Sequence, residues 1–525
     1  MFWLLFCAVL LVVFVFLKKK YTYWKEKGVV QDLAVPVFGL NWKLLTHQAS
    51  NIEIFQYLYD KHKKERYIGV YDFLTPIVII KDPDLLQEVL IKKFEHFTDH
   101  RPTIPSDVDP LWNKNVANLK GNKWKEMRSS LSPSFTSNKM RVMFVLMEQC
   151  AKNFVQYFLL KNEEIVETEI RESFSRYISD VIASTCFGYQ CNSMIDPDNE
   201  FYVKGLQASY DMSFWRHVKS SLLRVFPWMS KVIKVTRFGD DCTRFFRDVI
   251  KENVEFRDKN NVKRPDMITL LMEARNESPS NQDKDKNDSR FLIYELNASA
   301  SKKKIDLTVD DIAANAMVFF FAGFSTTTSL LCFMTYELAV NPDIQKKLLE
   351  EIDSLRKKTE KINYEDLNEL SHLHMIISET MRKYPPFCRN DRRCTKSFTI
   401  KNEEYPEKSF TIEAGHDIWF PIYALHHDSQ YWPEPEKFIP ERFSPENKKN
   451  IKPGTYLPFG IGPRGCMGYR FVLQTVKILF YELLSEFEII PVAKTAIPCQ
   501  LSKNTSHVIP GKGFWFGFKR REQSI

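Results

Sequence analysis

The sequence predicts a mainly α-helical fold with small β-sheets (α+β), and three observations support this prediction. Helical periodicity dominates from about residue 122 to 275, and the long, strongly apolar run 310–340 is typical of a buried helix. β-Branched and aromatic residues form short runs at 67–80 and 398–420, which indicate a few small strands. The sequence contains no internal repeat. Length alone would suggest about three domains, but these patterns indicate one large core.

Composition and charge exclude several classes of protein. The chain of 525 residues is 44% hydrophobic and carries 74 Lys and Arg against 66 Asp and Glu, a net charge of +8. It is therefore neither disordered nor strongly basic. No Lys/Arg-rich stripe interleaved with aromatic residues is present, so we expect no nucleic-acid partner. The ten cysteines are scattered without a C-x-x-C, which argues against a disulfide framework or a zinc site and favours reduced thiols.

The first twenty residues predict a membrane anchor. Residues 1–17 carry no charge, and at ~1.5 Å per residue they reach about 26 Å, near the lower limit for a bilayer span. A cleaved signal peptide would place its basic residues before the apolar run, whereas here Lys18–Lys20 follow it. Positive charge on that side puts the rest of the chain in the cytosol. We expect an anchor over 1–20, a linker over 21–40 and a catalytic domain over 41–525.

The remaining elements are expected in a definite order. Thr308 is a plausible N-cap for the long apolar helix, because Asp311 stands three residues further on, close to a capping box. Residues 215–228 mix basic and aromatic side chains, and are either an ordinary loop or a patch that dips into the membrane interface. The patterns predict a hairpin at 67–80, a helix at 83–93, an exposed or disordered loop at 276–288, helices at 310–340 and 343–357, strands at 398–420 and a helix at 471–487.

The most specific signal is the segment 459–468, FGIGPRGCMG. Its four glycines allow the backbone to turn tightly and to approach a flat ligand closely. Several N–H groups could then converge on the Cys466 sulfur, which would stabilise a thiolate and tune it as a metal ligand. Arg464 adds a cation and Phe459 an apolar cover, and the helix that follows brings its positive N-terminus. One cysteine with this support suits a single axial bond to iron better than a four-ligand zinc site.

This segment resembles the haem-binding loop of the haem-thiolate monooxygenases, the cytochrome P-450 family. The resemblance implies the cytochrome P-450 fold, haem b (iron protoporphyrin IX) as cofactor and Cys466 as the thiolate ligand of its iron. It also implies that Phe459 lies at the cofactor and that Arg464 reaches a haem propionate. The amino-acid sequences of 319–329 (FFFAGFSTTTS) and 458–468 (PFGIGPRGCMG) most resemble those of insect microsomal members that clear plant toxins and insecticides.

A second pattern of the family follows in the expected order. Glu379 and Arg382 form an E-x-x-R pattern, and residues three apart share one helix face, so these two can pair. E-x-x-R alone is a weak motif, and its value lies in its position upstream of 440–443 (PERF) and of Cys466. The resemblance implies that Arg442 completes a buried Glu–Arg–Arg network that holds the cysteine loop.

Three further residues are candidates for binding the cofactor. Trp124 and Arg128 are four apart and face the same way on a helix. Their indole N–H and guanidinium are suitable donors to a carboxylate, and the resemblance assigns both to a haem propionate. Arg392 aligns with another propionate-binding arginine of the family, although Arg393 beside it leaves that assignment open by one position.

The middle of the long apolar helix carries the candidate catalytic residues. Gly323 lowers helix stability by roughly 1 kcal/mol relative to Ala, which suggests a use: with a back-bonding Thr326 it can loosen the helix and open a groove. The resemblance implies that this groove holds dioxygen and a water, and that Thr326 helps to deliver protons. Ser325 stands where the family usually has an acid. Because Ser cannot carry a charge, delivery would depend more on Thr326, Thr327 and water.

The resemblance also implies a substrate pocket and an electron supply. An apolar pocket favours lipophilic molecules. The chain has no Gly-rich dinucleotide fingerprint, so electrons would come from a separate flavoprotein, the membrane-bound NADPH–cytochrome reductase, with cytochrome b5 as a second donor. A basic face would suit such acidic redox partners. By position in the family's pattern, the pocket is lined by Val318, Phe321, Ala322, Phe387, the loop 102–120 and the turn 504–508.

The sequence thus predicts a monooxygenase at the endoplasmic reticulum membrane, with its catalytic domain facing the cytosol. It would insert one oxygen atom of O2 into lipophilic substrates, either xenobiotics such as plant toxins and insecticides or endogenous lipids and hormones. Two alternatives stay open. Some relatives isomerise or dehydrate peroxides without a reductase, and Ser325 is compatible with that chemistry. The other alternative is a non-catalytic haem- or hydrophobe-binding protein, against which the retained Thr326 argues.

Overall fold

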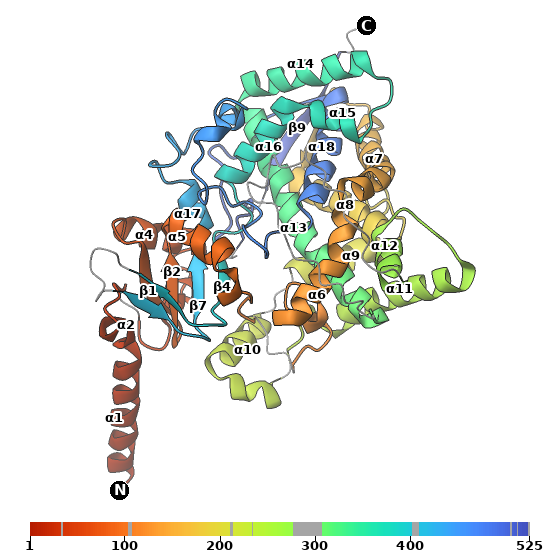
Figure 1. The fold of residues 1–525 in the computed structure, drawn as a ribbon. Helices are drawn as coiled ribbons and strands as arrows, with labels where there is room; N and C mark the ends of the chain where they lie inside the picture. The colour runs from red at the N-terminus through yellow and green to blue at the C-terminus, as the bar shows by residue number, and fades with distance from the viewer. Residues whose placement is uncertain are drawn as a thin grey trace.

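Helices form most of the molecule, and the sheets are small, as Figure 1 shows. The predicted fold class is therefore confirmed. The computed structural model describes residues 1–32, 35–102, 108–210, 214–233, 235–276, 307–401, 409–503, 507–511 and 513–522. The loop predicted at 276–288 lies outside the described residues from 277 onward.

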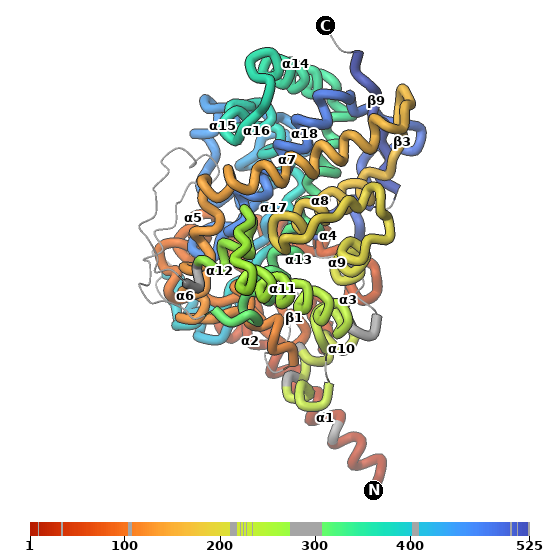
Figure 2. The backbone as a smooth tube through the Cα atoms, turned by 90° about the vertical axis from the view of Figure 1, so that its right-hand side faces the viewer, coloured from red at the N-terminus to blue at the C-terminus, as the bar shows by residue number. Residues whose placement is uncertain are grey.

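The central element is α13 (Val309–Val340), which runs through the middle of the molecule and is buried along most of its length. The Thr308 hydroxyl accepts the Asp311 amide and the Asp311 carboxylate accepts the Thr308 amide, so the predicted cap is confirmed as a capping box. Figure 2 views the helical side, where α8 and α11 pack across α13. The helices around it are α6 (Gly121–Leu131), α7 (Ser137–Leu159), α8 (Ile170–Cys186), α9 (Glu200–Tyr210), α11 (Asp240–Asn260), α12 (Met267–Asn276), α14 (Pro342–Lys358), α15 (Tyr364–Glu369), α16 (Ser371–Lys383) and α18 (Tyr469–Glu486).

The strands form three small sheets, with the orders β1-β2-β7-β4, β3-β9-β8 and β5-β6. The predicted hairpin is confirmed, since β1 pairs antiparallel with β2 and places Tyr67 opposite Ile80. Strand β3 lies within the stretch predicted as mostly helical. Its partner β9 comes from the far end of the chain, which no local pattern reveals. The strands are β1 (Tyr67–Asp72), β2 (Thr75–Ile80), β3 (Ile165–Glu169), β4 (Asn390–Arg393), β5 (Phe398–Ile400), β6 (Phe410–Ile412), β7 (Asp417–Phe420), β8 (Phe487–Ile490) and β9 (Trp515–Arg520).

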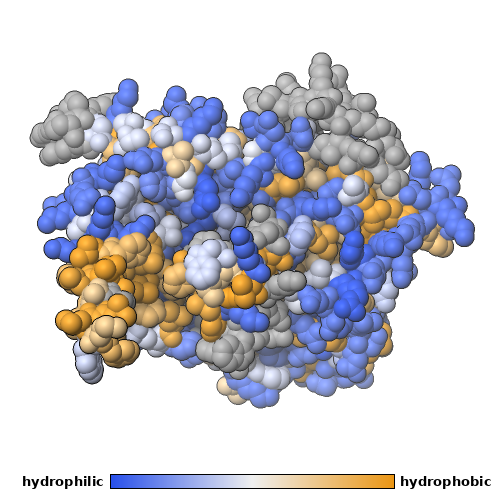
Figure 3. Space-filling model, turned by 90° about the horizontal axis from the view of Figure 1, so that it is seen from below, coloured by the Kyte–Doolittle hydropathy of each residue, from blue (hydrophilic) through white to orange (hydrophobic). Residues whose placement is uncertain are grey.

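Helix α1 (Phe2–Tyr21) projects from the body, and its side chains up to Phe16 are exposed almost throughout (Figures 1 and 2). Its length and composition would allow it to cross a membrane; α13 passes the same test but is largely buried, as a core helix would be. Figure 3 shows the face from which α1 emerges, where apolar atoms gather at the left. The other short helices near the sheets are α2 (Tyr23–Glu26), α3 (Asn41–Leu45), α4 (Asn51–Lys61), α5 (Pro83–Gln87) and α17 (Ile422–His426).

The start of the predicted linker is packed against the body. Trp24 in α2 is fully buried, and its Nε1 donates to the Val70 carbonyl of β1 at 3.0 Å. A Cβ on Gly69 would lie 2.4 Å from the Trp24 ring, so only glycine leaves room for the indole. The Tyr71 hydroxyl also donates to the Lys20 carbonyl at 2.9 Å. These contacts fasten the end of α1 to the edge of the four-stranded sheet.

The segment 215–228 lies mostly in a helix, so its interpretation as an ordinary loop is wrong. α10 spans Phe214–Val225, and a short 3-10 turn follows at Pro227–Lys231. Trp228 and Val232 behind it are 70% and 79% exposed. The alternative interpretation, a patch at a membrane interface, is compatible with this exposure.

Candidate active site

The cysteine loop is a tight turn that contains two left-handed glycines. Gly460 and Gly462 have φ angles of +72° and +75°. The Cys466 amide donates to the Phe459 carbonyl at 2.8 Å and closes the turn. A Cβ on Gly462 would lie 2.0 Å from the Leu90 carbonyl oxygen, so this close approach of two backbones requires glycine. Helix α18 begins directly behind the loop, as the sequence predicted.

The side chain of Cys466 is accessible although its surroundings are buried. Arg464 and Tyr469, on either side, are buried, whereas Cys466 is exposed. Burial of the site raises the pKa of the Cys466 thiol, while the Gly468 N–H and the Arg128 charge lower it. Accessible surface at such a place belongs to the wall of an internal space. Among the described residues, no group of three His, Cys, Asp or Glu could hold a metal, so Cys466 would act as a single ligand.

Two arginines lie beside the loop, Arg392 buried and Arg128 partly buried. Arg128 Nη2 donates to the Gly465 carbonyl at 2.8 Å, and Arg392 Nη1 donates to a backbone carbonyl at 2.6 Å. Burial lowers the pKa of each to about 10. Arg392 Nε has no partner in the described part of the chain, whereas Arg393 is paired through two N–H groups with Asp417 at 2.7 and 3.0 Å. Of the two arginines, Arg392 thus retains an unused donor, and its binding of a propionate stays a prediction.

Arg464 makes contacts that the sequence did not predict. Its guanidinium donates to the carbonyls of Thr98 at 2.7 Å, Leu119 at 2.8 Å and Val116 at 3.2 Å. It also lies 4.0 Å over the ring of Trp124. Burial lowers the pKa of Arg464 to about 9. Arg464 thus ties the segment before α6 to the cysteine loop, and its contact with a propionate stays a prediction.

The structure adds His100 to the residues beside these arginines. Its Nδ1 lies 3.4 Å from Asp391 Oδ1. Burial lowers the pKa of His100, and the charges of Arg392 and Arg464 lower it further. No sequence pattern marks His100, because a lone histidine before Arg101 carries no spacing signal. Its contact with Asp391 of β4 joins residues that are 291 positions apart in the chain.

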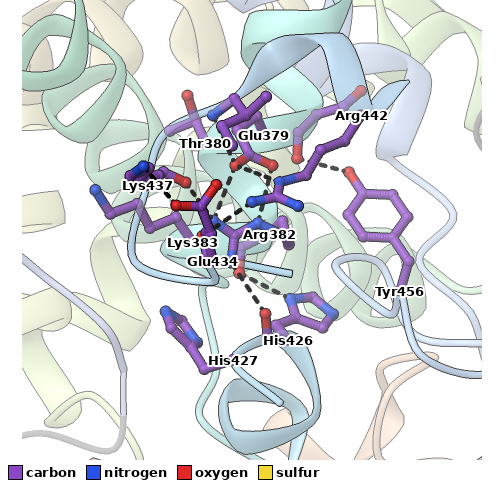
Figure 4. A network of polar contacts seen from close by, with 12 residues as sticks. Glu379, Thr380, Arg382, Lys383, His426, His427, Glu434, Lys437, Arg442 and Tyr456 are labelled. Carbon is purple, nitrogen blue, oxygen red and sulfur yellow. Dashed lines mark hydrogen bonds and ion pairs between the residues drawn. The ribbon is translucent and has the colours of Figure 1, made fainter. Parts of the chain in front are cut away.

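Glu379, Arg382 and Arg442 form one network (Figure 4). Nε and Nη2 of Arg382 donate to the two carboxylate oxygens of Glu379 at 2.8 and 2.9 Å, and both residues are fully buried. Arg442 Nε donates to the same carboxylate at 3.4 Å, and the Ile439 amide donates to it at 3.0 Å. Every oxygen of the buried carboxylate is thereby bonded, which is the condition for keeping such a pair inside a protein.

His426 connects this network to the cysteine loop (Figure 4). The Leu457 amide donates to its Nε2 at 2.8 Å, so its Nδ1 carries the hydrogen and donates to the Arg382 carbonyl at 3.1 Å. Arg382 Nη1 returns a bond to the His426 carbonyl at 3.0 Å. Burial is the main cause that lowers the pKa of His426 to about 3. The Leu457 carbonyl accepts the Gly460 amide at 3.1 Å, which carries the chain of bonds into the loop.

The middle of α13 presents accessible surface inside the molecule. Ala322 is exposed and Gly323 and Thr326 are partly so, whereas Ser325 and Thr327 are buried. The Thr326 hydroxyl donates to the Ala322 carbonyl at 2.5 Å, the predicted back-bond. The helix continues without interruption, so the groove does not come from an opened turn. A Cβ on Gly323 would meet the Ile182 side chain of α8 at 3.4 Å, so the accessible surface is mainly that of Ala322 and Thr326.

The predicted pocket residues make different local contacts. Val318 is 8% exposed, and the ring of Phe321 stacks on Phe238 with their centroids 3.5 Å apart. Phe387 stands edge-on to His507, with ring centroids 4.7 Å apart, and the two form a β-bridge. The structure therefore places Phe321 and Phe387 in different local contacts. Of the predicted loops, residues 103–107 and 504–506 lie outside the described part of the chain.

Comparison with known proteins agrees with this geometry. The family model described as Cytochrome P450 matches residues 31–516. Cytochrome P450 9e2 of Blattella germanica is 38% identical over 518 residues, which cover 95% of this chain and 94% of that protein. Probable cytochrome P450 9f2 of Drosophila melanogaster is 34% identical over 510 residues, 95% of each chain. Cytochrome P450 6k1 of Blattella germanica is 34% identical over 507 residues, 96% and 94% of the two chains. The chain belongs to the cytochrome P450 family.

Proposed function

We propose that this protein is a membrane-anchored haem-thiolate monooxygenase that inserts one oxygen atom of O2 into lipophilic substrates with electrons from NADPH. Family membership supports the more general statement that the protein is an oxidoreductase of the monooxygenase type that uses haem iron. Cys466 carries the proposal, because it is a single accessible thiol on an internal wall beside a cation. We propose an anchor over 1–20, a linker over 21–40 whose start is packed on the sheet, and a catalytic domain over 41–525.

The residues around Cys466 fit haem b. The accessible sulfur would hold the iron as a single thiolate ligand, and Phe459 stands at the start of the same loop. Arg128 and Arg392 form no ion pair within the described residues, and Arg392 Nε is a buried donor without a partner. Two propionates would supply the missing carboxylates. The residues that would hold them are Arg128, Arg392, Arg464, Trp124 and His100.

Haem bound through a thiolate supplies the activation of dioxygen. The chain's own part at the cysteine is to keep the sulfur negative in a buried place. The Gly468 N–H and the Arg128 charge favour the negative sulfur, and they partly offset the larger rise in the pKa of Cys466 that burial causes. The glycine turn lets the loop backbone lie against the Leu90 carbonyl, which fixes the backbone that carries the sulfur.

Thr326 is our candidate for holding a proton on the α13 side. Its hydroxyl hydrogen is used on the Ala322 carbonyl, so its oxygen is left to accept a hydrogen bond from water. Ser325 and Thr327 add hydroxyl groups but are buried, and neither can carry a charge. Of the three, Thr326 has the accessible surface. We therefore propose that water ordered by Thr326 takes over the part of the acid that Ser325 replaces.

Lipophilic substrates follow from the apolar walls near Ala322. Phe321, Phe238 and Val318 gather there, and walls of this kind bind apolar molecules with few polar contacts. The relatives named above are insect proteins. We propose xenobiotics such as plant toxins and insecticides as the substrate class, with endogenous lipids or hormones as the alternative.

The anchor and the electron supply belong to the same proposal. The exposed apolar α1 ends in Lys18, Lys19 and Lys20, a pattern that places the lysines on the cytosolic side of a membrane. We propose the endoplasmic reticulum membrane as the location, with the catalytic domain facing the cytosol. The partners would be the NADPH–cytochrome reductase and, as a second donor, cytochrome b5. Electrostatic attraction from the net charge of +8 would favour acidic partners.

The test uses the purified full chain, loaded with haem and reconstituted with NADPH–cytochrome reductase. A panel of lipophilic molecules is first screened for spectral binding, and each binder is then assayed for product. We expect oxygenated product only when NADPH and the reductase are both present. Turnover without NADPH would contradict the proposal and favour the isomerase or dehydratase alternative. Binding without product under every condition would favour the carrier alternative.

A further inference from the structure

Three aromatic rings from different segments meet beside the accessible part of α13. Phe321 of α13 stacks on Phe238 at 3.5 Å with 19° between the planes. Trp112, in a 3-10 turn (Trp112–Lys114), stands edge-on to Phe238 at 4.8 Å and lies 6.3 Å from Phe321. We call these three residues the aromatic stack. Phe321 directly precedes the exposed Ala322, so the stack borders the proposed pocket.

One buried carboxylate binds both segments that bring the outer rings. Asp109 is 4% exposed. Its Oδ1 accepts the Trp112 amide at 3.0 Å, and its Oδ2 accepts the Arg237 amide at 2.9 Å. Because Arg237 directly precedes Phe238, the two oxygens fix the backbones on which the two rings are mounted. Loss of either hydrogen bond would leave one oxygen of the buried carboxylate without a partner, which costs free energy. The carboxylate therefore favours the arrangement in which both segments are in place.

The other side of the Trp112 segment is fastened independently. Asn315 Oδ1 of α13 accepts the Val116 amide at 3.0 Å, and Arg464 of the cysteine loop donates to the Val116 carbonyl at 3.2 Å. The segment is thus held firmly where it meets α13 and the cysteine loop. Among the described residues, the Asp109 carboxylate and the packing of the rings join it to the Arg237 segment. If the two segments separate, they separate at Asp109.

We propose that Asp109 is a positioning residue that keeps Trp112 and Phe238 closed over Phe321 and thereby restricts the entry of bulky substrates to the pocket. The inference rests on the proposed function, since it takes the space at Ala322 as the substrate pocket. A small ligand does not need the rings to part. A bulky aromatic ligand does, because the 3.5 Å stack of Phe321 on Phe238 leaves no gap between them.

The experiment compares two ligands of ferric haem by stopped-flow absorbance on the holoenzyme. Imidazole is the small ligand and 4-phenylimidazole the bulky one. Asp109→Asn keeps the shape of the side chain but replaces one acceptor oxygen by a donor. We expect it to raise the association rate of 4-phenylimidazole about fivefold, as for the loss of one hydrogen bond from the closed form, and to change that of imidazole less than twofold. The matched control is Asp241→Asn, which removes the same charge from an exposed position in α11 and should change neither rate.

A second variant distinguishes the loss of the Asp109 contact from a general loosening of the pocket wall. Phe238→Ala removes a ring of the stack, and it should also speed 4-phenylimidazole binding. Adding Asp109→Asn to that variant should then have little further effect, because no ring remains for the carboxylate to hold. A full fivefold increase in the Phe238→Ala background would overturn the proposal. So would equal effects on the two ligands, or no effect of either single variant.

Hydrogen exchange gives a readout that does not use haem. Peptides that contain the Trp112 and Arg237 amides should exchange faster in Asp109→Asn, while peptides from α16 should not. Unchanged exchange at both amides would contradict the positioning role. The absence of a thiolate-type spectrum would contradict the proposed function. The exchange result would still decide whether Asp109 holds the two segments.

Discussion

The cysteine side of the site and the α13 side are held by different kinds of contact. On the cysteine side, buried charges and backbone groups bond one another from Glu379 through Arg382 and His426 to the loop at Gly460. On the α13 side, rings stack on rings, and the hydroxyl of Thr326 bonds within its own helix. The cysteine side is a polar network in which each group needs its partners, whereas the α13 side is an apolar wall.

This difference matches what each side has to do. A metal ligand must be held in one geometry, and a saturated buried network resists distortion because breaking it leaves charges unpaired. A pocket for varied lipophilic molecules gains from contacts that are weak, numerous and not directional. We therefore expect substitutions on the cysteine side to destroy the folded, haem-loaded protein and those on the α13 side to change its behaviour.

The largest effect is expected for Glu379→Gln. The change would leave the Arg382 guanidinium buried without its carboxylate, at about 3–5 kcal/mol of unfolding free energy. Urea unfolding and the yield of haem-loaded protein measure it. Glu365→Gln is the matched control, because Glu365 is 56% exposed in its pair with Arg141 and such pairs contribute ~0–1 kcal/mol. Similar losses in the two variants would mean that the buried network does not hold the cysteine side.

Two glycines of one loop give the next comparison. Gly460 and Gly462 have nearly the same φ, +72° and +75°, but a Cβ on Gly460 would meet its nearest atom at 3.8 Å and one on Gly462 would meet the Leu90 oxygen at 2.0 Å. The left-handed strain of roughly 1–2 kcal/mol is common to both alanine variants. Only Gly462→Ala adds an overlap with backbone, typically a further ~1–3 kcal/mol.

Thermal unfolding and haem content compare the two variants directly. We expect Gly460→Ala to bind haem with reduced stability and Gly462→Ala to lose haem. Equal behaviour would show that the approach of Leu90 to the loop is not needed, and the cysteine side would then be less rigid than we infer.

Acid should weaken the cysteine side through His426. Burial lowers the pKa of His426 in the folded chain to about 3, below the ordinary value of 6.5. Below pH 6.5 the imidazole therefore binds a proton in the unfolded chain but not in the folded chain. Stability contributed by neutral His426 is present above pH 6.5 and falls by up to ~1.4 kcal/mol per pH unit as the pH drops toward the folded pKa. Urea unfolding between pH 7 and 5 should show a shallower slope in His426→Gln than in the natural chain. Identical slopes would contradict this.

The smallest structural effect and the clearest functional one are expected for Thr326→Ala. Thr326 and Thr328 each donate one hydroxyl bond to the carbonyl four residues back, at 2.5 and 2.7 Å. Removing either should cost about 1 kcal/mol. Only Thr326 has accessible surface, so only Thr326→Ala should divert NADPH electrons from product to hydrogen peroxide. If Thr328→Ala uncouples as strongly, or Thr326→Ala stays coupled, the proton-holding role is wrong.

Local patterns predicted much of the fold. The hairpin at 67–80, the capping box at Thr308 and the helix behind Cys466 were visible because hydrogen bonding within a few residues determines them. β3 was missed because its partner is β9. The packing of the start of the predicted linker was not predictable, because nothing local marks Trp24 as buried against Gly69.

The candidate site was predictable where a motif places side chains on one element. Glu379 and Arg382 share a helix, and the spacing gave their pairing. No sequence pattern predicted the contacts of His100, Asp109 and Arg464, because each contact joins segments from distant parts of the chain. The difference between Arg392, which keeps an unused donor, and Arg393, which pairs with Asp417, was also visible only in the structure.

The most direct test of the central claim is the absorption spectrum of the reduced, haem-loaded protein with carbon monoxide. Our account predicts the red-shifted Soret band of a thiolate-ligated haem. That band should vanish in Cys466→Ala and persist in Cys499→Ala, a change at a partly buried cysteine away from the loop. A band typical of histidine-ligated haem in the natural chain, or an unchanged band in Cys466→Ala, would contradict it.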